Sequence, residues 1–243
     1  MTNPVLATAR YVGVGVRTIG DVKIGPNCII EDYCIIGKPT MHSLSRALRD
    51  PRHDITLTEQ TKVGTGCTLG AGTKIYAGSM LEDEVETEDD VRIGWNATIG
   101  RRSRLMYRAQ VYCGVVIGIE CRVAGFVGDN TVFGDRVSSF GSFVHDYPHH
   151  TTTYEPRPSA VVGDEVIVGW GAVIVGGVRI GRGAYLAANA LVTRDVPEDH
   201  VAFGVNKLCR KDSWAGRLGD LAQDGHSATG VLGSTTGSLR RDS

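Results

Sequence analysis

The chain of 243 residues is poor in aromatic residues, close to neutral and without long hydrophobic runs. Aromatic residues make up 7% of it against 32 glycines, which favours a repetitive all-β protein with a narrow interior. A formal net charge of −1 gives no general basic field, so we expect neither nucleic acid nor an anionic membrane as a partner. No run of 18 apolar residues could span a membrane, and the N-terminus lacks the apolar stretch of a signal peptide. We therefore expect a cytoplasmic protein.

A six-residue repeat runs through most of the chain. In the stretch VGTGCTLGAGTKIYAGSM, each block of six opens with an aliphatic residue and has a small residue at its fifth position. Stepping by six from Val63 to Val123 gives eleven openers, of which ten are Val, Ile or Leu. The pattern also covers residues 24–36 and 162–192, and residues 127–139 carry it in a shifted frame. A period of six fits neither an α-helix nor an ordinary strand, so the repeat decides the fold before any single element does.

The period predicts a triangular solenoid, in which six residues make one side and one corner. Three sides then make a coil of about 18 residues, and we expect about seven coils. The opener points inward, and so does the fifth residue, at a place that admits only a small side chain. The six cysteines include no CxxC pair, which disfavours a zinc ribbon or a redox site, and no metal is expected. Four of them occupy fifth positions, where they are expected as small buried residues: Cys28, Cys34, Cys67 and Cys121.

The blocks IGPNCI, VGTGCT, IGWNAT, VGDEVI and IGRGAY resemble those of the hexapeptide-repeat proteins. The resemblance covers about residues 12–205 and implies an all-β domain over residues 1–210, folded as a left-handed parallel β-helix. Residues 211–243 lose the repeat. Their first part, KDSWAGRLGDLAQ, could form a short C-terminal helix that caps the last strand edge, and disorder is expected from about Asp224.

Two insertions interrupt the repeat, and loops on a rigid scaffold often carry functional sites. The first, residues 37–61, includes MHSLSRALRD, which could form a short helix. Its arginines, Arg46, Arg49 and Arg52, could meet a phosphate of coenzyme A or of a sugar nucleotide. The alternative is a solvated excursion that only covers the edge of a coil.

The second insertion, residues 145–161, holds three of the seven histidines: His145, His149 and His150. In the shifted frame His145 falls at an opener, so its imidazole is expected at the wall, with the other two out along the loop. Histidine has a pKa suited to removing a proton from a hydroxyl or an amine, and we take all three as candidate catalytic bases. The alternative is that they are ordinary polar loop residues.

The segment LVTRDVP resembles the closing part of the hexapeptide acyltransferases, although GVNK lacks the proline of their final turn. The resemblance implies a homotrimer that binds acetyl-CoA or another acyl-CoA between neighbouring subunits. It also implies direct acyl transfer to an amino or hydroxyl group of a sugar, an amino sugar or a sugar nucleotide, with a histidine base and a backbone N–H group at the oxyanion. In maltose- and galactoside-type acetyltransferases of this family that base falls near His149 or His150. The implied neighbours of the pantetheine arm are Trp170, Gly171, Ala187 and Ala188, and those of the CoA phosphates are Arg194 and Lys207.

Two other functions fit the same fold. The γ-class carbonic anhydrases bind zinc with two histidines five apart and a third from another wall. His145 and His150 are five apart, but residues 54–144 contain no histidine, so a three-histidine site is not expected. A non-catalytic β-helical scaffold subunit would bind no CoA. A nucleotidyltransferase with a β-helical tail is disfavoured, because the repeat begins by about residue 12 or 24 and leaves no room for an α/β domain.

Overall fold

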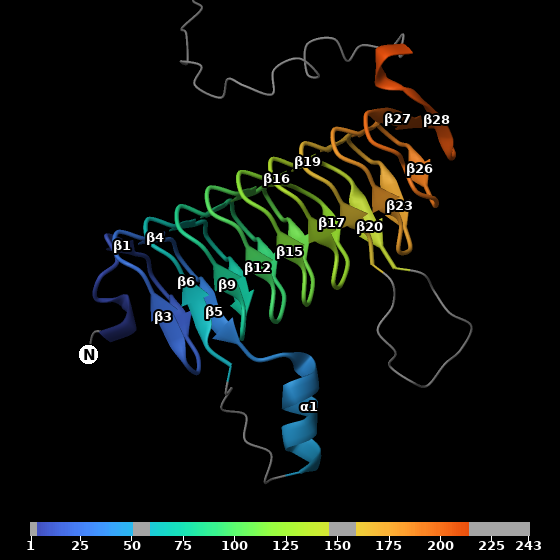
Figure 1. Ribbon diagram of the computed structural model, residues 1–243. Coiled ribbons are helices and arrows are strands. Elements are labelled where there is room, and N and C mark those ends of the chain that lie inside the picture. The colour runs from blue at the N-terminus through green and yellow to red at the C-terminus, as the bar shows by residue number, and fades with distance from the viewer. Residues whose placement is uncertain (1–3, 51–58, 146–158, 214–243) are drawn as a thin grey trace, which may run out of the picture. The chain divides into compact units, whose positions relative to one another are not determined.

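The chain winds as a three-sided solenoid of short parallel strands in a computed structural model that describes residues 4–50, 59–145 and 159–213 (Figure 1). Except for the last two strands, three consecutive strands belong to three different sheets, and strands three places apart in the chain pair with each other. All these pairs are parallel, and only the final pair of sheet A is antiparallel. The expected parallel β-helix is therefore confirmed.

The strands are two to four residues long. Sheet A has eleven strands, in the order β1 (Tyr11–Val12), β4 (Ile29–Ile30), β7 (Thr68–Leu69), β10 (Glu86–Thr87), β13 (Arg104–Leu105), β16 (Arg122–Val123), β19 (Ser138–Ser139), β22 (Ile167–Val168), β25 (Tyr185–Leu186), β27 (His200–Phe203) and β28 (Lys207–Arg210). Sheet B has nine, β2 (Arg17–Thr18), β5 (Ile35–Lys38), β8 (Lys74–Tyr76), β11 (Arg92–Ile93), β14 (Gln110–Val111), β17 (Phe126–Val127), β20 (Ser142–Val144), β23 (Val173–Val175) and β26 (Leu191–Val192). Sheet C has eight, β3 (Val22–Ile24), β6 (Thr61–Val63), β9 (Met80–Leu81), β12 (Thr98–Ile99), β15 (Val116–Ile117), β18 (Val132–Phe133), β21 (Val161–Val162) and β24 (Arg179–Ile180).

The number of coils is larger than expected. Sheet B receives one strand from each coil, and its nine strands make the expectation of about seven coils wrong. The coils already begin at Tyr11, and both insertions lengthen a corner without removing a coil.

The repeat explains the core, because the openers from Ile30 to Val192 are buried and the residue before each faces outward. The fifth positions are buried too, and the four cysteines predicted there are 0 to 1% exposed. The thiol of Cys121 donates to the carbonyl oxygen of Gly134 at 3.2 Å, and burial raises the pKa of Cys34 and of Cys121 to about 11. The Cys34 and Cys121 thiols therefore stay protonated, and all four cysteines fill space in the core, as predicted.

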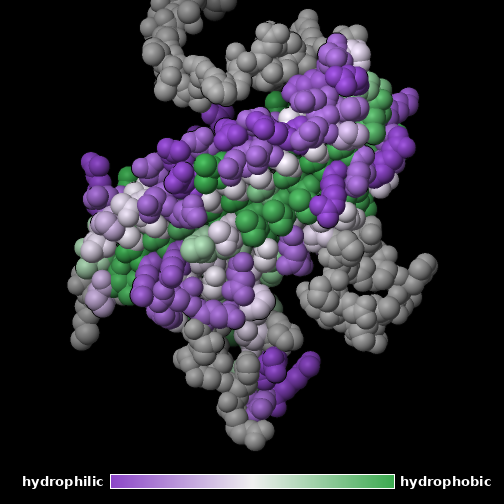
Figure 2. Space-filling view, in the orientation of Figure 1, coloured by the Kyte–Doolittle hydropathy of each residue, from purple (hydrophilic) through white to green (hydrophobic). Residues whose placement is uncertain are grey.

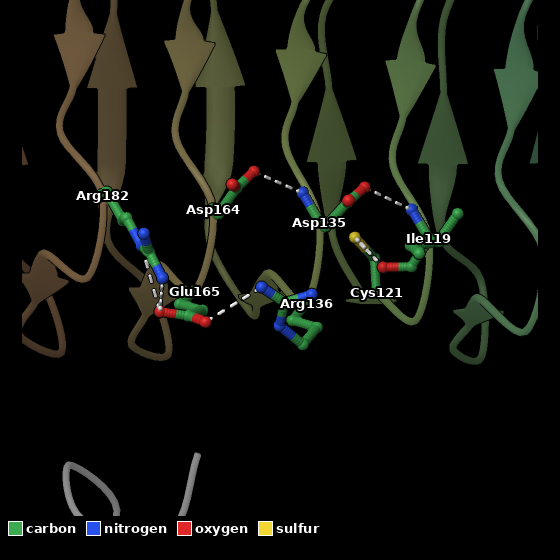
Figure 3. A network of polar contacts seen from close by, with 7 residues as sticks. All are labelled: Ile119, Cys121, Asp135, Arg136, Asp164, Glu165 and Arg182. Atoms are coloured by element: carbon green, nitrogen blue, oxygen red, sulfur yellow. Dashed lines mark hydrogen bonds and ion pairs between the residues drawn. The ribbon is translucent and has the colours of Figure 1, made fainter. Parts of the chain in front are cut away.

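Polar contacts join the coils at the corner between sheets C and A (Figure 3). The carboxylate of Asp135 accepts a hydrogen bond from the Ile119 N–H group at 3.0 Å, and that of Asp164 accepts one from the Asp135 N–H group at 2.9 Å. Beside them the carboxylate of Glu165 bridges the guanidinium groups of Arg136 and Arg182, at 2.9 and 3.1 Å. The corner carboxylates therefore satisfy backbone donors of the preceding coil and hold the stack in register.

The shifted frame comes from two short corners between sheets A and B. Val123 and Val127 are adjacent openers four residues apart, and so are Ser139 and Phe143, where six is usual. Gly125 forms the first of these corners with a φ of 78°, and a Cβ there would lie 2.4 Å from the carbonyl oxygen of Gly141, so both the turn and the close contact favour glycine. The second short corner shifts the frame by a further two residues, so the expectation that His145 is an opener is wrong. Phe143 holds that place, pairs with Ile174 and is buried.

Both insertions leave the solenoid at the corner between sheets B and C. The first follows β5 and forms the predicted helix, α1 (Met41–Arg49), whose N-cap Thr40 accepts a hydrogen bond from the Ser43 N–H group. It returns along the corner, where the Glu59 carboxylate accepts a hydrogen bond from the Trp95 indole. The second follows β20, and the described chain resumes at Ser159, whose hydroxyl donates to the carbonyl oxygen of Asp129 at 2.6 Å. Arg52 lies outside the described residues.

The two ends of the solenoid carry short 3-10 turns. The N-terminal turn is η1 (Pro4–Leu6), and the C-terminal turn, η2 (Lys211–Ser213), follows the β27–β28 hairpin. Of the helix expected over KDSWAGRLGDLAQ only these first three residues are described, and the remainder, with the tail from Asp224, lies outside the described residues. Within the described ranges no helix is long and apolar enough to cross a membrane.

Candidate functional site

Sheet B and its two edges carry most of the residues that the sequence singled out. His145 follows β20 directly, is half-buried and lies at the edge shared with sheet C. The other two candidate bases, His149 and His150, lie outside the described residues. One of three candidate bases is therefore placed, and it sits at the root of the second insertion.

Four of the predicted cofactor neighbours meet on the opposite edge of sheet B. Trp170 and Gly171 form the corner between β22 and β23, and Ala187 and Ala188 form the same corner one coil further on. The coils touch closely there, because a Cβ at Gly169 would lie 2.7 Å from the backbone nitrogen of Ala188. The side chain of Trp170 is 73% exposed beside this small-residue surface. The sequence thus identified a set of residues that the fold brings together.

The two predicted phosphate-binding cations also lie close to each other. The Arg194 guanidinium donates to the carbonyl oxygen of Asn206, whose side-chain oxygen accepts from the Thr193 N–H group at 2.8 Å. Lys207 follows in sequence and is exposed at the start of β28. Asn206 therefore ties both cations to one turn at the C-terminal end of sheet B.

The candidate base, His145, and the candidate cofactor corner at Trp170 lie at opposite ends of the strands of sheet B. β20 and β23 pair in register, with Ser142 opposite Val173 and Val144 opposite Val175. Trp170 and Gly171 precede this pair of strands at one edge, and His145 follows it at the other. A strand of three residues spans roughly 10 Å. Within one chain the two groups are neighbours in the stack without converging on one point.

A row of cations and tyrosines on sheet B escaped the sequence analysis. The Lys38 ammonium lies 3.3 Å from the Tyr76 hydroxyl and 4.6 Å from the centre of its ring. The Arg92 guanidinium carbon lies 5.0 Å from the ring centre of Tyr76 and 4.7 Å from that of Tyr112. The signal was present in the sequence, because two of the few aromatic residues directly follow openers of sheet B and so point outward.

A half-buried cysteine lies on the corner next to this row. The Cys113 N–H group donates to the Asp129 carboxylate at 2.9 Å, and burial raises the pKa of its thiol. A thiol held in its neutral form is a weak nucleophile, so Cys113 does not suggest covalent catalysis.

Comparison with known proteins bears on the C-terminal coils in particular. Residues 160–194 match a family model described as the hexapeptide repeat of succinyl-transferase. The bifunctional protein GlmU of Geotalea uraniireducens is 29% identical over 213 residues, which are 84% of this chain and 41% of that protein. The chain thus spans about two fifths of the length of this relative.

Two solved structures give weaker matches. LpxA from Acinetobacter baumannii shares 18% sequence identity at a TM-score of 0.39, over 82% of this chain and 73% of that one. The GDP-perosamine N-acetyl transferase of Caulobacter crescentus, in its complex with CoA and GDP-perosamine, shares 18% at a TM-score of 0.29, over 72% and 69%. At these values neither structural likeness carries an argument about the present chain. The family-model match fits the left-handed winding that the resemblance to hexapeptide-repeat proteins implies.

Proposed function

We propose that this chain, a hexapeptide-repeat protein by its fold and its sequence, transfers an acyl group from an acyl-CoA to a small acceptor. The observation that carries the proposal is the corner formed by Trp170, Gly171, Ala187 and Ala188. It lies within residues 160–194, which match the succinyl-transferase repeat, and it leads into the LVTRDVP segment. The acyl group is acetyl or a larger one, and the acceptor is a sugar, an amino sugar or a sugar nucleotide.

The corner suits an extended, polar chain such as pantetheine. Ala188 is exposed, and small side chains let a ligand approach the backbone closely enough for hydrogen bonds. The exposed indole of Trp170 offers an apolar surface on the same corner, at a position where burial by a ligand is favourable. Arg194 follows β26, and Lys207 begins β28. Both lie next to Asn206 and supply positive charge for the phosphates.

Acyl transfer also needs a base for the acceptor. His145 is the described candidate, beside His149 and His150, and an amine acceptor needs less help from a base than a hydroxyl does. Because His145 and Trp170 lie at opposite edges of sheet B, a complete site requires a second copy of the chain that brings the two edges together. We therefore propose that the protein works as a homotrimer with its sites between subunits.

An apolar row on sheet C supports association of copies. Figure 2 shows a hydrophobic band over this sheet. Its outward residues are 37 to 40% exposed and come from β9, β15, β18 and β21: Met80, Val116, Val132 and Val161. Val116, Val132 and Val161 are direct neighbours across the strands, and exposed apolar surface of this kind marks interaction sites.

Calorimetry with acetyl-CoA on the purified chain, with zinc measured in the same sample, tests the function. We expect micromolar binding that weakens at least tenfold in Trp170→Ala. Tyr107→Ala is the matched control, since Tyr107 is an exposed aromatic residue on the same kind of corner three coils earlier and should leave binding unchanged. Stoichiometric zinc without CoA binding would instead identify an anhydrase-like protein. Binding of neither would contradict the transferase and leave a scaffold.

A further inference from the structure

The N-terminal strands of sheet B concentrate positive charge. Four successive strands of the sheet, β2, β5, β8 and β11, contribute one cation each: Arg17, Lys38, Lys74 and Arg92. None of the nine described strands of this sheet contains Asp or Glu. The whole chain has 26 basic and 27 acidic residues, so composition does not explain this segregation. We call these four residues the cation row.

Two of these cations are held in a defined geometry by aromatic rings. The Arg92 guanidinium contacts the rings of Tyr76 and Tyr112, which come from the strands on either side of its own. Gly94, two residues after Arg92, has no side chain to fill the space between these rings. A guanidinium whose faces meet rings keeps its in-plane N–H donors for a ligand, and this is the geometry that binds a carboxylate or a phosphate through two parallel hydrogen bonds.

Three of the four cations are also partly removed from water, with no counter-charge paired to them among the described residues. Lys38, Lys74 and Arg92 are each half-buried. Among the ion pairs between described residues, none involves any of the three. Nε of Arg92 is buried and has no hydrogen-bond acceptor among these residues. Contacts with rings offset only part of the cost of desolvating a cation, so an incoming anion would gain more here than at an exposed lysine.

The cation row spans the coils around the root of the first insertion and lies on the N-terminal side of the second. β5 leads into the first insertion, which returns past Trp95, and the second insertion returns at Asp129. β11 is separated from β20, where His145 follows, by three strand spacings, which is roughly 14 Å. It is separated from β23, which follows Trp170, by four spacings, or roughly 19 Å. Arg92, at the near end of the row, is therefore distinct from the proposed CoA corner and lies roughly 14 Å along the stack from the strand that His145 follows.

We infer that the cation row binds the anionic part of the acceptor, with Arg92 and Lys38 as the principal contacts. The acceptor thus carries a phosphate or carboxylate group roughly 14 Å from its reactive group. Its identification as the acceptor rests on the proposed function, whereas the binding of an anion at Arg92 does not.

Calorimetry at low salt on the full chain tests this with four probes. Inorganic pyrophosphate and UDP represent phosphates, citrate represents carboxylates, and N-acetylglucosamine is the neutral control. We expect at least one anion to bind and the neutral sugar not to bind. Arg92→Met and Lys38→Met should each weaken binding of that anion at least tenfold, and Arg92→Lys should lie between wild type and Arg92→Met because it keeps the charge but loses the planar fork.

The matched control is Arg122→Met, which removes the same charge from an exposed strand position on sheet A. It should leave anion binding unchanged, and thermal unfolding should show that all variants fold. Failure of all three anions to bind, or an equal loss in Arg122→Met, would overturn the inference.

Acetyl-CoA binding, measured on the same samples, separates the two proposals. Arg92→Met should keep it, and Trp170→Ala should lose it while still binding the anion. An anion bound through Arg92 without any CoA binding would refute the transferase and keep the site. CoA binding without an anion site would refute this inference alone.

Discussion

The ring of Phe143 meets that of Phe133 edge to face inside the solenoid, with 4.9 Å between the ring centres. Both are openers of one coil, and the third opener of that coil is the small Ser139. The neighbouring coil has Ile117, Val123 and Val127 in the same three places. Two large residues are thus balanced by one small one, which keeps the interior filled to normal density.

Replacement of Phe143 by Ala should strongly destabilise the solenoid. The cavity left in a rigid stack costs about 3–5 kcal/mol in the free energy of unfolding, and denaturation by urea measures it. Ser139→Ala in the same coil is the control. The hydroxyl of Ser139 is buried without a hydrogen-bond partner among the described residues, so its removal should leave stability unchanged or raise it. A small loss in Phe143→Ala would show that the frame is assigned wrongly.

The sequence predicted the fold because the inward positions accept so few residue types. Val63, Ile93 and Cys121 are all buried, as the period predicts. The narrow core accepts only an aliphatic side chain at an opener and only a small one at a fifth position. The period could not locate the two short corners. The corner before Phe143 is two residues shorter than usual, and no residue type in the sequence marks the place where the frame shifts. The expectation for His145 failed for that reason. Outward positions tolerate most residues, so the alignment of Arg92 with Tyr76 and Tyr112 became visible only in three dimensions.

His145→Ala should separate catalysis from stability. His145 follows the strand and is no opener, so we expect a change in unfolding free energy of about 1 kcal/mol or less. Loss of a general base should lower the rate of acetyl transfer to a hydroxyl acceptor by about 10²- to 10⁴-fold, and transfer to an amine by less. Release of free CoA from acetyl-CoA measures the rate. His200→Ala removes another half-buried histidine, at the start of β27, and should leave the rate unchanged. If the rate survives in His145→Ala, the base lies elsewhere.

The contribution of Glu165 to stability should depend on pH. Hydrogen bonds from Arg136 and then from Arg182 hold the pKa of this carboxyl below its ordinary value. A folded-state pKa below the unfolded one gives stability that is complete above the unfolded pKa and disappears as the pH falls through the folded one. Glu165→Gln should therefore lower the melting temperature slightly at pH 7 and not at all in strong acid.

The size of this effect is limited by solvent, because the side chains of all three residues are 35 to 59% exposed and salt screens their charges. Thermal unfolding at several pH values and two salt concentrations measures it. Glu120→Gln is the control, since Glu120 pairs with Arg102 alone and should give a smaller difference. A difference between wild type and Glu165→Gln that grows as the pH falls would contradict the assigned direction.

The apolar row on sheet C should determine whether copies of the chain associate. A carboxylate in the middle of a buried interface has no partner and is costly to desolvate, so Val116→Glu should convert a trimer into monomers. Light scattering after size exclusion measures the mass. Val14→Glu is the control, since Val14 is 70% exposed at the corner between β1 of sheet A and β2 of sheet B, outside sheet C, and should leave the mass unchanged. Because His145 and Trp170 lie on opposite edges of sheet B, a monomeric Val116→Glu should also lose acyl transfer while keeping its fold. A monomeric variant with full activity would show that one chain contains a complete site.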